Sequence, residues 1–292
     1  MSIGYQKRDL EVVDYQLYPL LSPVSKRVFV TRGPRPLTLE PDQYFACIGP
    51  ASTFGCYCEK PYGTLLQERL GLPTLNLGFA GAGPDYFLRN QKDLLGYINH
   101  ARFAIVLVMS GRSESNSLFE SIFGTGMYRR ISDGQQIAAS NAYEELLKDG
   151  DLDLIKKIVS ETRGNWVLHF KALLSLIQKP KVLLWLSKRR PAYVEKYTNA
   201  QKLFGSFPQL VNAEMIEVIK PYCDAYVECV TERGIPQPLI NRFTGKPTTV
   251  SEGSIFGGKV ISHNTYYASP EMHEDAAKML VPICQGFLSR DL

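Results

Sequence analysis

The stretch that decides the fold runs from residue 44 to residue 84 and reads YFACIGPASTFGCYCEKPYGTLLQERLGLPTLNLGFAGAGP. Residues 44–49 form a short apolar run that ends at a glycine, a pattern typical of a buried parallel strand. Residues 61–70 begin with proline and place their leucines on one face, which predicts a helix. Gly71 can end that helix in a left-handed conformation, and residues 75–77 predict a second short strand. The stretch therefore indicates a strand, a turn, a helix and a second strand.

Two turns follow these strands, and both are rich in small residues. The first contains Ser52, and the second contains Gly81 and Gly83. In an open parallel sheet both turns lie at the carboxyl edge, where such proteins bind their ligands. The pattern thus predicts where the site lies, and it says less about the chemistry there.

Composition limits the class of protein. The chain has 292 residues, of which 45% are hydrophobic and 21% charged, as in an ordinary globular protein with ample core. The net charge of +4 is mild, so we expect no nucleic-acid partner. Residues 1–9 lack the apolar segment of a signal peptide, and no apolar run is long enough to span a bilayer. The six cysteines are scattered and most simply reduced, so we expect a cytoplasmic protein without a membrane partner.

Strands and helices alternate along the rest of the chain. The strongest strand prediction is 103–109, which is wholly apolar and should lie at the centre of a parallel sheet. Further strands are predicted at 27–30, 181–186 and 225–230, and helices at 84–102, through most of 118–180, near 215–219 and at 271–288. This alternation predicts an α/β fold, a three-layer sandwich with a mostly parallel, flavodoxin-like sheet.

Three less regular segments accompany this pattern. Residues 1–43 contain several prolines and are expected to form an irregular arm over the sheet. The glycines and polar residues of 124–141 suggest a mobile loop or lid. Residues 231–268 predict an extended excursion. We assign all three segments to one domain, residues 1–292.

The order of these segments resembles the SGNH, or GDSL-type, hydrolase superfamily. That family has a Gly-Asp-Ser turn with the nucleophilic serine, a glycine turn, a Gly-x-Asn-Asp turn, and an Asp-x-x-His motif before the last helix. The corresponding blocks here are Gly49-Pro50-Ala51-Ser52-Thr53-Phe54-Gly55, Asn76-Leu77-Gly78-Phe79-Ala80-Gly81-Ala82-Gly83, Gly111-Arg112-Ser113-Glu114 and Pro270-Glu271-Met272-His273. The resemblance covers residues 44–120 and the C-terminal helix. The chain also resembles a bacterial subfamily of this fold often met in surface-polysaccharide contexts.

The first and third blocks depart from the family pattern. When the glycines of the first block are aligned, Ala51 stands at the position of the nucleophilic serine, and Ser52 follows one residue later. Ser113 stands at the position of the oxyanion asparagine, and Asn116 is close by. A serine hydrolase needs serine, histidine and an orienting carboxylate in a hydrogen-bonded sequence.

The fourth block keeps its histidine and loses the carboxylate. Pro270 replaces the aspartate that would orient His273, and Glu271 is the nearest acidic residue. The resemblance therefore implies a hydrolase architecture with an altered catalytic triad.

One functional hypothesis keeps the hydrolase chemistry. Ser52 would be the nucleophile, His273 the base and Glu271 its orienting group. The amides of the turn at Gly81 and Gly83, together with Asn116, would form an oxyanion hole. The substrate would be an ester or acyl group on a carbohydrate or another hydroxyl-rich molecule. The alternative role for Ser52 is a hydroxyl that caps the following helix.

A second hypothesis keeps the site and changes the chemistry. The neutral donors would be Ser52, Ser110, Ser113 and Asn116. The cations Arg112, Lys188, Arg189 and Arg190 would bind an anionic sulfo, phospho or acidic sugar group. Group transfer of this kind needs His273 as base and no protein nucleophile. The alternative for residues 188–190 is a solvated helix start. In a third hypothesis the site is inactive and the protein is a binding partner.

The remaining candidates are weaker. Cys47, Cys56 and Cys58 lack the spacing of a zinc site, so we expect no metal. The glycines of 78–83 do not fit a dinucleotide fingerprint, and we expect no cofactor. The histidines that lie in helical stretches, His100 and His169, are predicted to be structural. Aromatic residues near the edge could stack on a sugar ring or simply pack in the core, namely Phe54, Tyr57, Tyr62, Tyr266 and Tyr267.

Overall fold

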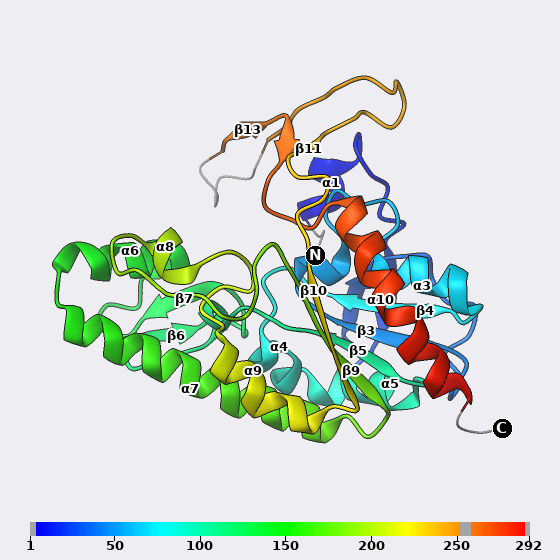
Figure 1. Cartoon of the computed structure of the whole chain (residues 1–292), viewed down its shortest axis with the longest axis horizontal. Helices are drawn as coiled ribbons and strands as arrows, with labels where there is room; N and C mark the ends of the chain where they lie inside the picture. The colour runs from blue at the N-terminus through cyan, green and yellow to red at the C-terminus, as the bar shows by residue number, and fades with distance from the viewer. Residues whose placement is uncertain (1–3, 252–257, 290–292) are drawn as a thin grey trace.

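The computed structural model describes residues 4–251 and 258–289, and at its centre lies a five-stranded parallel sheet (Figure 1). The strands are β3 (Phe45–Gly49), β4 (Thr74–Gly78), β5 (Ala104–Leu107), β9 (Lys181–Ser187) and β10 (Ala225–Val230). They lie in the order β10-β9-β5-β3-β4, so β3 has the second strand of the sheet on one side and the third on the other. This is the flavodoxin-like order. The predicted α/β class and parallel sheet are confirmed.

Side chains of each strand alternate between two cores. On β3, Ala46 and Ile48 face one core, and Phe45 and Cys47 face the other. The first core is covered by α4 (Pro84–Arg89), α5 (Gln91–His100), α7 (Leu152–Leu176) and α9 (Ala213–Ile219), and the second by α3 (Tyr62–Leu70) and α10 (Pro270–Leu288). Burial on both faces explains why the central strands are apolar throughout.

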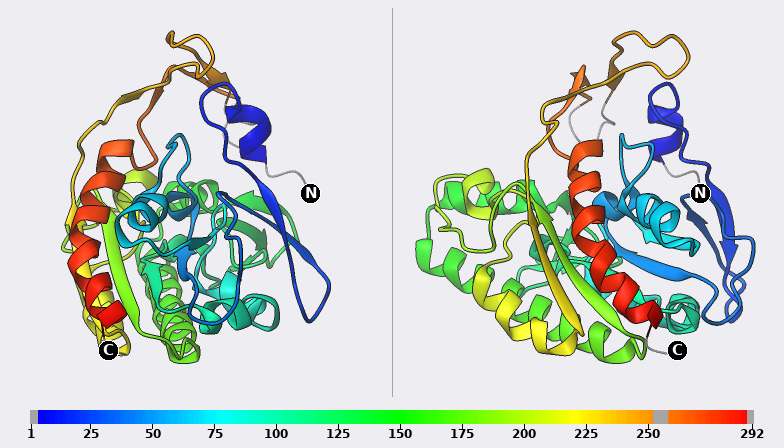
Figure 2. Two further views of the ribbon diagram at one scale, coloured as in Figure 1. Left: turned by 90° about the vertical axis from the view of Figure 1, so that its right-hand side faces the viewer. Right: turned by 45° about the vertical axis from the view of Figure 1, so that its right-hand side comes forward.

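Two peripheral segments meet near the start of α10 (Figure 2). The N-terminal arm contains α1 (Gly4–Asp9) and an antiparallel pair of β1 (Tyr18–Leu21) with β2 (Val28–Thr31). The excursion pairs β11 (Gln237–Pro238) with β14 (His263–Asn264), and β12 (Val250–Ser251) with β13 (Val260–Ile261). Residues 252–257 of the predicted excursion and residues 1–3 of the arm lie outside the described residues.

One region differs from the prediction. Residues 118–180 were expected to be mainly helical, and they begin with an antiparallel sheet of β6 (Phe119–Ser121), β7 (Met127–Arg130) and β8 (Gln136–Ala138). The segment 124–141 is therefore a paired hairpin with the start of α6 (Ala139–Asp149), and not a free loop. Phe119 and Tyr128 stack with centroids 5.5 Å apart and help to seed a third core, which α8 (Ala200–Phe204) completes.

The predicted helix over 84–102 is interrupted at Asn90, which separates α4 from α5. The Asn90 side chain accepts a hydrogen bond from Arg27 (2.7 Å) and donates one to the carbonyl of Tyr86 (2.7 Å). These bonds give the chain an alternative to the helical pattern. In the part of the chain that the structure describes, no helix is both long and apolar enough to cross a membrane.

Candidate functional site

The strand order fixes where a ligand should bind. The chain leaves β3 towards β4 on one side and later enters β5 on the other, so the sheet has a switch point between β3 and β5. In open α/β sheets, ligands bind in the crevice outside the carboxyl ends of the strands at such a point. The turns after β3, β4 and β5 all reach this edge. The place where these three turns meet, named the crevice here, is therefore the expected ligand-binding region.

The turn after β3 carries Ser52. A short helix, α2 (Ala51–Phe54), starts directly after the strand, and Pro50 occupies its N-cap position without a side-chain hydrogen bond. Ser52 is 7% exposed, and its hydroxyl has no hydrogen-bond partner among residues 4–251 and 258–289. The helix packs so closely on β4 that a Cβ at Gly78 would collide with the main chain of Phe54. The hydroxyl is thus not used as a cap and remains available.

His273 lies at the start of α10, fully buried. Its Nδ1 accepts a hydrogen bond from the main-chain N–H of Tyr62 (3.2 Å), so Nε2 is the nitrogen that carries the proton. No described residue accepts a hydrogen bond from Nε2. Burial, together with the nearby charge of Arg32, lowers the pKa of His273 to about 3. As placed, His273 is a neutral N–H donor.

This arrangement differs from the triad expected from the sequence. A triad histidine donates Nδ1–H to a carboxylate and accepts the serine proton at Nε2. Glu271 is exposed, and its carboxylate instead packs against Gly234. Within the described ranges, no hydrogen bond joins any two of Ser52, His273 and Glu271. As the chain is placed, the three residues are not linked as a triad.

Arg32, which sequence analysis missed, holds the loop that follows α2. It is 2% exposed and donates to the carbonyls of Phe54 (3.1 Å), Gly55 (2.8 Å), Cys58 (2.6 Å) and Glu59 (2.7 Å). Its guanidinium also lies over the ring of Tyr15, 4.9 Å from the centroid. A proline-rich arm gives no local signal for such a role, because the partners are more than twenty residues away. The loop beside Ser52 is therefore part of the interior.

The turn after β5 presents a charge to the crevice. It forms a 3₁₀ helix, Gly111–Ser113, from which Arg112 Nε donates to Gln209 Oε1 (2.6 Å) and Nη2 lies 3.5 Å from the Tyr266 hydroxyl. Arg112 is partly exposed, and no carboxylate of the described segments pairs with it. An arginine without an acidic partner is suited to bind an anionic or strongly polarised oxygen.

The glycine turn after β4 packs against the turn that carries Arg112. Ser113 Oγ donates to the carbonyl of Gly81 (3.0 Å), and Gly81 has φ +68°. At Gly83 a Cβ would lie 2.7 Å from the Cβ of Ser113, so only glycine allows the two turns to approach so closely. Of the predicted site residues, Gly81, Gly83, Arg112 and Ser113 are therefore brought together. Ser113 uses its hydroxyl to fasten the turns to each other.

Asn116 and Arg189 instead form hydrogen bonds within the protein. Asn116 donates to Thr162 Oγ1 (3.0 Å) and accepts from the main-chain N–H groups of Leu118 and Phe119 (3.0 Å each). Arg189 donates to main-chain carbonyls, and burial lowers its pKa to about 10. The predicted roles of both in substrate binding are not supported by their contacts, because their donors are used within the protein. Lys188, next to Arg189, donates to the carbonyl of Thr265, and burial lowers its pKa.

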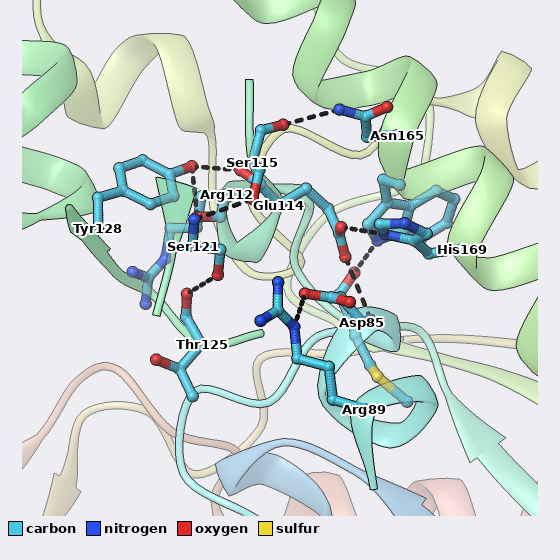
Figure 3. Close-up of polar contacts among 12 residues, drawn as sticks. Asp85, Arg89, Arg112, Glu114, Ser115, Ser121, Thr125, Tyr128, Asn165 and His169 are labelled. Atoms are coloured by element: carbon cyan, nitrogen blue, oxygen red, sulfur yellow. Dashed lines mark hydrogen bonds and ion pairs between the residues drawn. The ribbon is translucent and has the colours of Figure 1, made fainter. Parts of the chain in front are cut away.

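Figure 3 shows a second polar cluster behind the Arg112 turn, between α4 and α7. His169 Nδ1 lies 2.6 Å from Glu114 Oε2, and Arg89 Nε donates to Asp85 Oδ2 (2.6 Å). The hydrogen bond to Glu114 raises the pKa of His169. Burial raises the pKa of Glu114, against the opposing effect of His169. His169, predicted to be structural, thus anchors the buried carboxylate two residues beyond Arg112.

The same face of α7 fixes the main chain of this turn. Trp166 Nε1 donates to the carbonyl of Met109 (3.0 Å), and Asn165 Nδ2 donates to that of Ser115 (3.0 Å). Together with His169, these residues lie on one stripe of the helix. The turn that carries Arg112 is therefore held from behind at several points, which lets the guanidinium face the crevice in a fixed position.

Other parts of the described chain provide weaker candidates for a functional site. A hollow of about 740 Å³ lies at the outer end of the sheet, between β10 and α10, and is lined by Arg190, Glu228, Cys229, Val230, Thr231, Asp275, Lys278 and Met279. Of the residues predicted to bind an anionic group, Arg190 lines this hollow, and Arg112, Lys188 and Arg189 do not. In residues 4–251 and 258–289, no group of three or more His, Cys, Asp or Glu side chains is placed to hold a metal ion.

The fold and the crevice define a class: an α/β protein with a flavodoxin-like parallel sheet and its candidate site at the switch point. Comparison with protein families is more specific. The chain belongs to the family described as "Domain of unknown function (DUF6473)", which matches residues 6–121 and 145–288. A comparison with curated proteins gave no significant match.

Solved structures show remote likenesses. A family two carbohydrate esterase from Clostridium thermocellum in complex with cellohexaose is 9% identical, over 89% of this chain and 68% of that one, with a TM-score of 0.41. A carbohydrate esterase family 2 enzyme from Corynascus thermopiles is 11% identical, over 90% and 71%, with a TM-score of 0.42. A putative lipolytic protein of the G-D-S-L family from Desulfitobacterium hafniense is 13% identical, over 82% and 100%, with a TM-score of 0.37. Likenesses of this degree support no statement about activity.

Proposed function

We propose that the protein is an enzyme that acts on an ester or acyl group of a carbohydrate or another hydroxyl-rich substrate, bound in the crevice. One observation supports this most. The two turns of the switch point carry a hydroxyl without a partner in the described chain, on Ser52, and a guanidinium without an acidic partner there, on Arg112. A nucleophile and a stabiliser of negative charge are the two groups that acyl transfer requires.

The chemical roles follow from these positions. The Ser52 oxygen would attack the carbonyl carbon of the ester, and the negative charge would develop on the carbonyl oxygen. Arg112 and the main-chain N–H groups of the glycine turn would stabilise that oxygen. The Ser52 proton would pass by way of His273 to the departing alcohol oxygen as the ester C–O bond breaks. A water molecule would then add to the acyl group, release the acid and return a proton to the Ser52 oxygen.

His273 limits this proposal and favours a second candidate. Because its Nδ1 accepts the Tyr62 N–H, the imidazole must exchange tautomers and release that bond before it can take the Ser52 proton. Arg112, a cation without an acidic partner in the described chain, would equally bind an anionic group. The second candidate is therefore transfer of a sulfo or phospho group to a substrate hydroxyl, without a protein nucleophile.

The test compares two variants on two substrate classes. We expect wild-type protein to release acetate from an acetylated methyl glucoside or from triacetin, and Ser52→Ala to lower kcat by about 100-fold or more. Arg112→Gln should lower kcat/KM by a similar factor, because it removes charge stabilisation. Ser132→Ala changes an exposed serine of the β7–β8 turn and serves as the control.

The outcomes separate the candidates. If wild-type protein releases no acetate from either ester, the acyl proposal is wrong. If Ser52→Ala keeps full activity while Arg112→Gln loses it, no serine nucleophile is involved. Activity on an activated sulfate donor that depends on Arg112 and not on Ser52 would establish the second candidate.

A further inference from the structure

The turn that joins β6 to β7, residues 122–126, begins the antiparallel hairpin region and forms part of the rim of the crevice. The N–H of Gly83 donates to the carbonyl of Gly124 (2.9 Å), which docks the hairpin onto the glycine turn. A Cβ at Gly126 would lie 2.5 Å from Arg112 Nη1, so the hairpin main chain rests directly on the guanidinium. Within the hairpin, Thr125 Oγ1 donates to the carbonyl of Ile122 (2.8 Å). The turn at 122–126 is thus held in place beside Arg112.

Phe123 lies in this turn in an unfavourable state. Its side chain is 72% exposed, and its φ is +57°. A left-handed backbone is rare for a bulky residue that is not glycine, and a large exposed aromatic gains nothing from the hydrophobic effect. No ring contact of Phe123 occurs in the part of the molecule that the structure describes. The stability of the fold therefore does not explain a phenylalanine here.

Backbone strain of this kind persists where the surroundings enforce it, and it is concentrated at ligand-binding sites. Tyr266 adds to the pattern, because it is 47% exposed and its hydroxyl lies 3.5 Å from Arg112 Nη2. The rim thus offers aromatic faces beside a charged, hydrogen-bonding crevice. A sugar ring has the matching shape, since its C–H face is apolar and its edge carries hydroxyls.

The sequence of the hairpin supports a role in specificity. Residues 122–144 fall between the two portions that match the family, 6–121 and 145–288. Loops positioned by a rigid scaffold commonly carry binding residues. The turn at 122–126 is such a loop, because it is fixed to the glycine turn and to the Arg112 guanidinium, and it carries Phe123.

We propose that Phe123 is a specificity-determining residue, on which the ring of a carbohydrate substrate stacks while polar groups of that substrate face Arg112. The carbohydrate class and the crevice rest on the proposed function. The contact itself needs no turnover, so it can be tested by binding alone.

The experiment measures binding and stability in the same variants. The probe is the amide analogue of an acetylated methyl glucoside, which an esterase does not cleave, and N-acetylethanolamine is the acyclic comparison. Dissociation constants come from ligand-observed NMR, and melting temperatures from calorimetry. Phe123→Gly should raise the melting temperature, because glycine accepts a positive φ, and should weaken binding of the ring probe by about tenfold or more. Phe123→Tyr should bind as wild-type protein does.

The controls distinguish this inference from the proposed function. Ile131→Ala removes another exposed apolar side chain of the same hairpin region and should leave binding unchanged. Failure of the wild-type protein to bind the ring probe, or equal binding by Phe123→Gly, overturns the inference. Equal losses for the ring and acyclic probes also overturn it. If wild-type protein releases acetate and Phe123→Gly binds the ring probe as tightly as wild type does, the inference is wrong and the proposed function stands. If binding of the ring probe depends on Phe123 but no acetate is released, only the proposed function is wrong.

Discussion

The two walls of the crevice are built in opposite ways. On the β3 side, Arg32 and His273 are buried and hold main-chain groups of the loop and helix that follow Ser52. On the β5 side, Arg112 is partly exposed, and its charge faces the crevice from a turn that α7 supports. A buried charge that satisfies carbonyls contributes to stability, whereas an exposed charge without an acidic partner is available to a ligand. Residue type alone therefore does not distinguish a cation used inside the protein from one that a ligand can reach.

The largest effect is expected at Arg32. Replacement by Met removes the hydrogen bonds to four carbonyls, of which that of Gly55 keeps the main-chain N–H of Cys58 as a donor. The free energy of unfolding should therefore fall by about 3 kcal/mol or more. Chemical denaturation measures this change. Arg112→Met should change stability by about 1 kcal/mol or less, because its side chain is partly exposed and donates only one short hydrogen bond, to Gln209 (2.6 Å). The contrast between the walls is wrong if the two substitutions have equal effects on stability.

The second-largest expected effect is a pH dependence of the protein's stability that comes from the buried β3 wall. The pKa of His273 falls to about 3 in the folded protein, below its ordinary value of about 6.5. The unfolded chain therefore binds a proton that the folded protein excludes. Stability present above pH 6.5 should be lost progressively as the pH falls towards 3, by at most about 4 kcal/mol.

The matched variant is His273→Asn, whose side-chain oxygen can still accept the Tyr62 N–H and does not titrate in this range. Urea unfolding at several pH values, compared between the wild type and this variant, isolates the histidine from the carboxylates. Parallel pH profiles for the two proteins would contradict the burial of a neutral imidazole.

The smallest effect is expected at His169, and it has the opposite sign. Its pKa is raised by the hydrogen bond to Glu114, so its contribution to stability is present below pH 6.5 and lost as the pH rises through the folded pKa. Because the imidazole is partly exposed, we expect less than about 1 kcal/mol. NMR titration of the His169 ring gives the pKa directly, and Glu114→Gln should lower it. A pKa below that of a free histidine would show that the pair is not formed.

Much of the architecture could be predicted from local patterns. The strand at 103–109 is a wholly apolar run of the kind that a doubly covered sheet buries, so its central position could be predicted from the sequence. The segments 181–186 and 225–230 could be predicted as strands, and 225–230 forms a less buried edge. The turns at Ser52, Gly81 and Arg112 follow the strands predicted at 44–49, 75–77 and 103–109. Strand polarity then places them at one edge. These inferences need no knowledge of distant contacts.

The chemistry of the site could not be predicted in the same way. The tautomer of His273 depends on the N–H of Tyr62, which lies 211 residues away in the chain. Arg189 donates its hydrogen bonds to main-chain carbonyls of a later loop, and the sequence around Arg189 does not predict these partners. The hairpin at 124–141 was mistaken for a loop because its short strands contain too few residues to show a clear alternation. His169 gave no signal, because its partner Glu114 lies on a different element.

Tyr57 links the loop beside Ser52 to two distant parts of the chain. Its N–H donates to the hydroxyl of Tyr15 (3.1 Å) in the N-terminal arm, and its carbonyl accepts from Gln237 Nε2 (2.8 Å) in the excursion. An expressed fragment limited to the alternating strands and helices would therefore lose both tethers of this loop. Studies of activity should begin with a polypeptide that retains both segments, since trimming either one changes the surroundings of the candidate nucleophile.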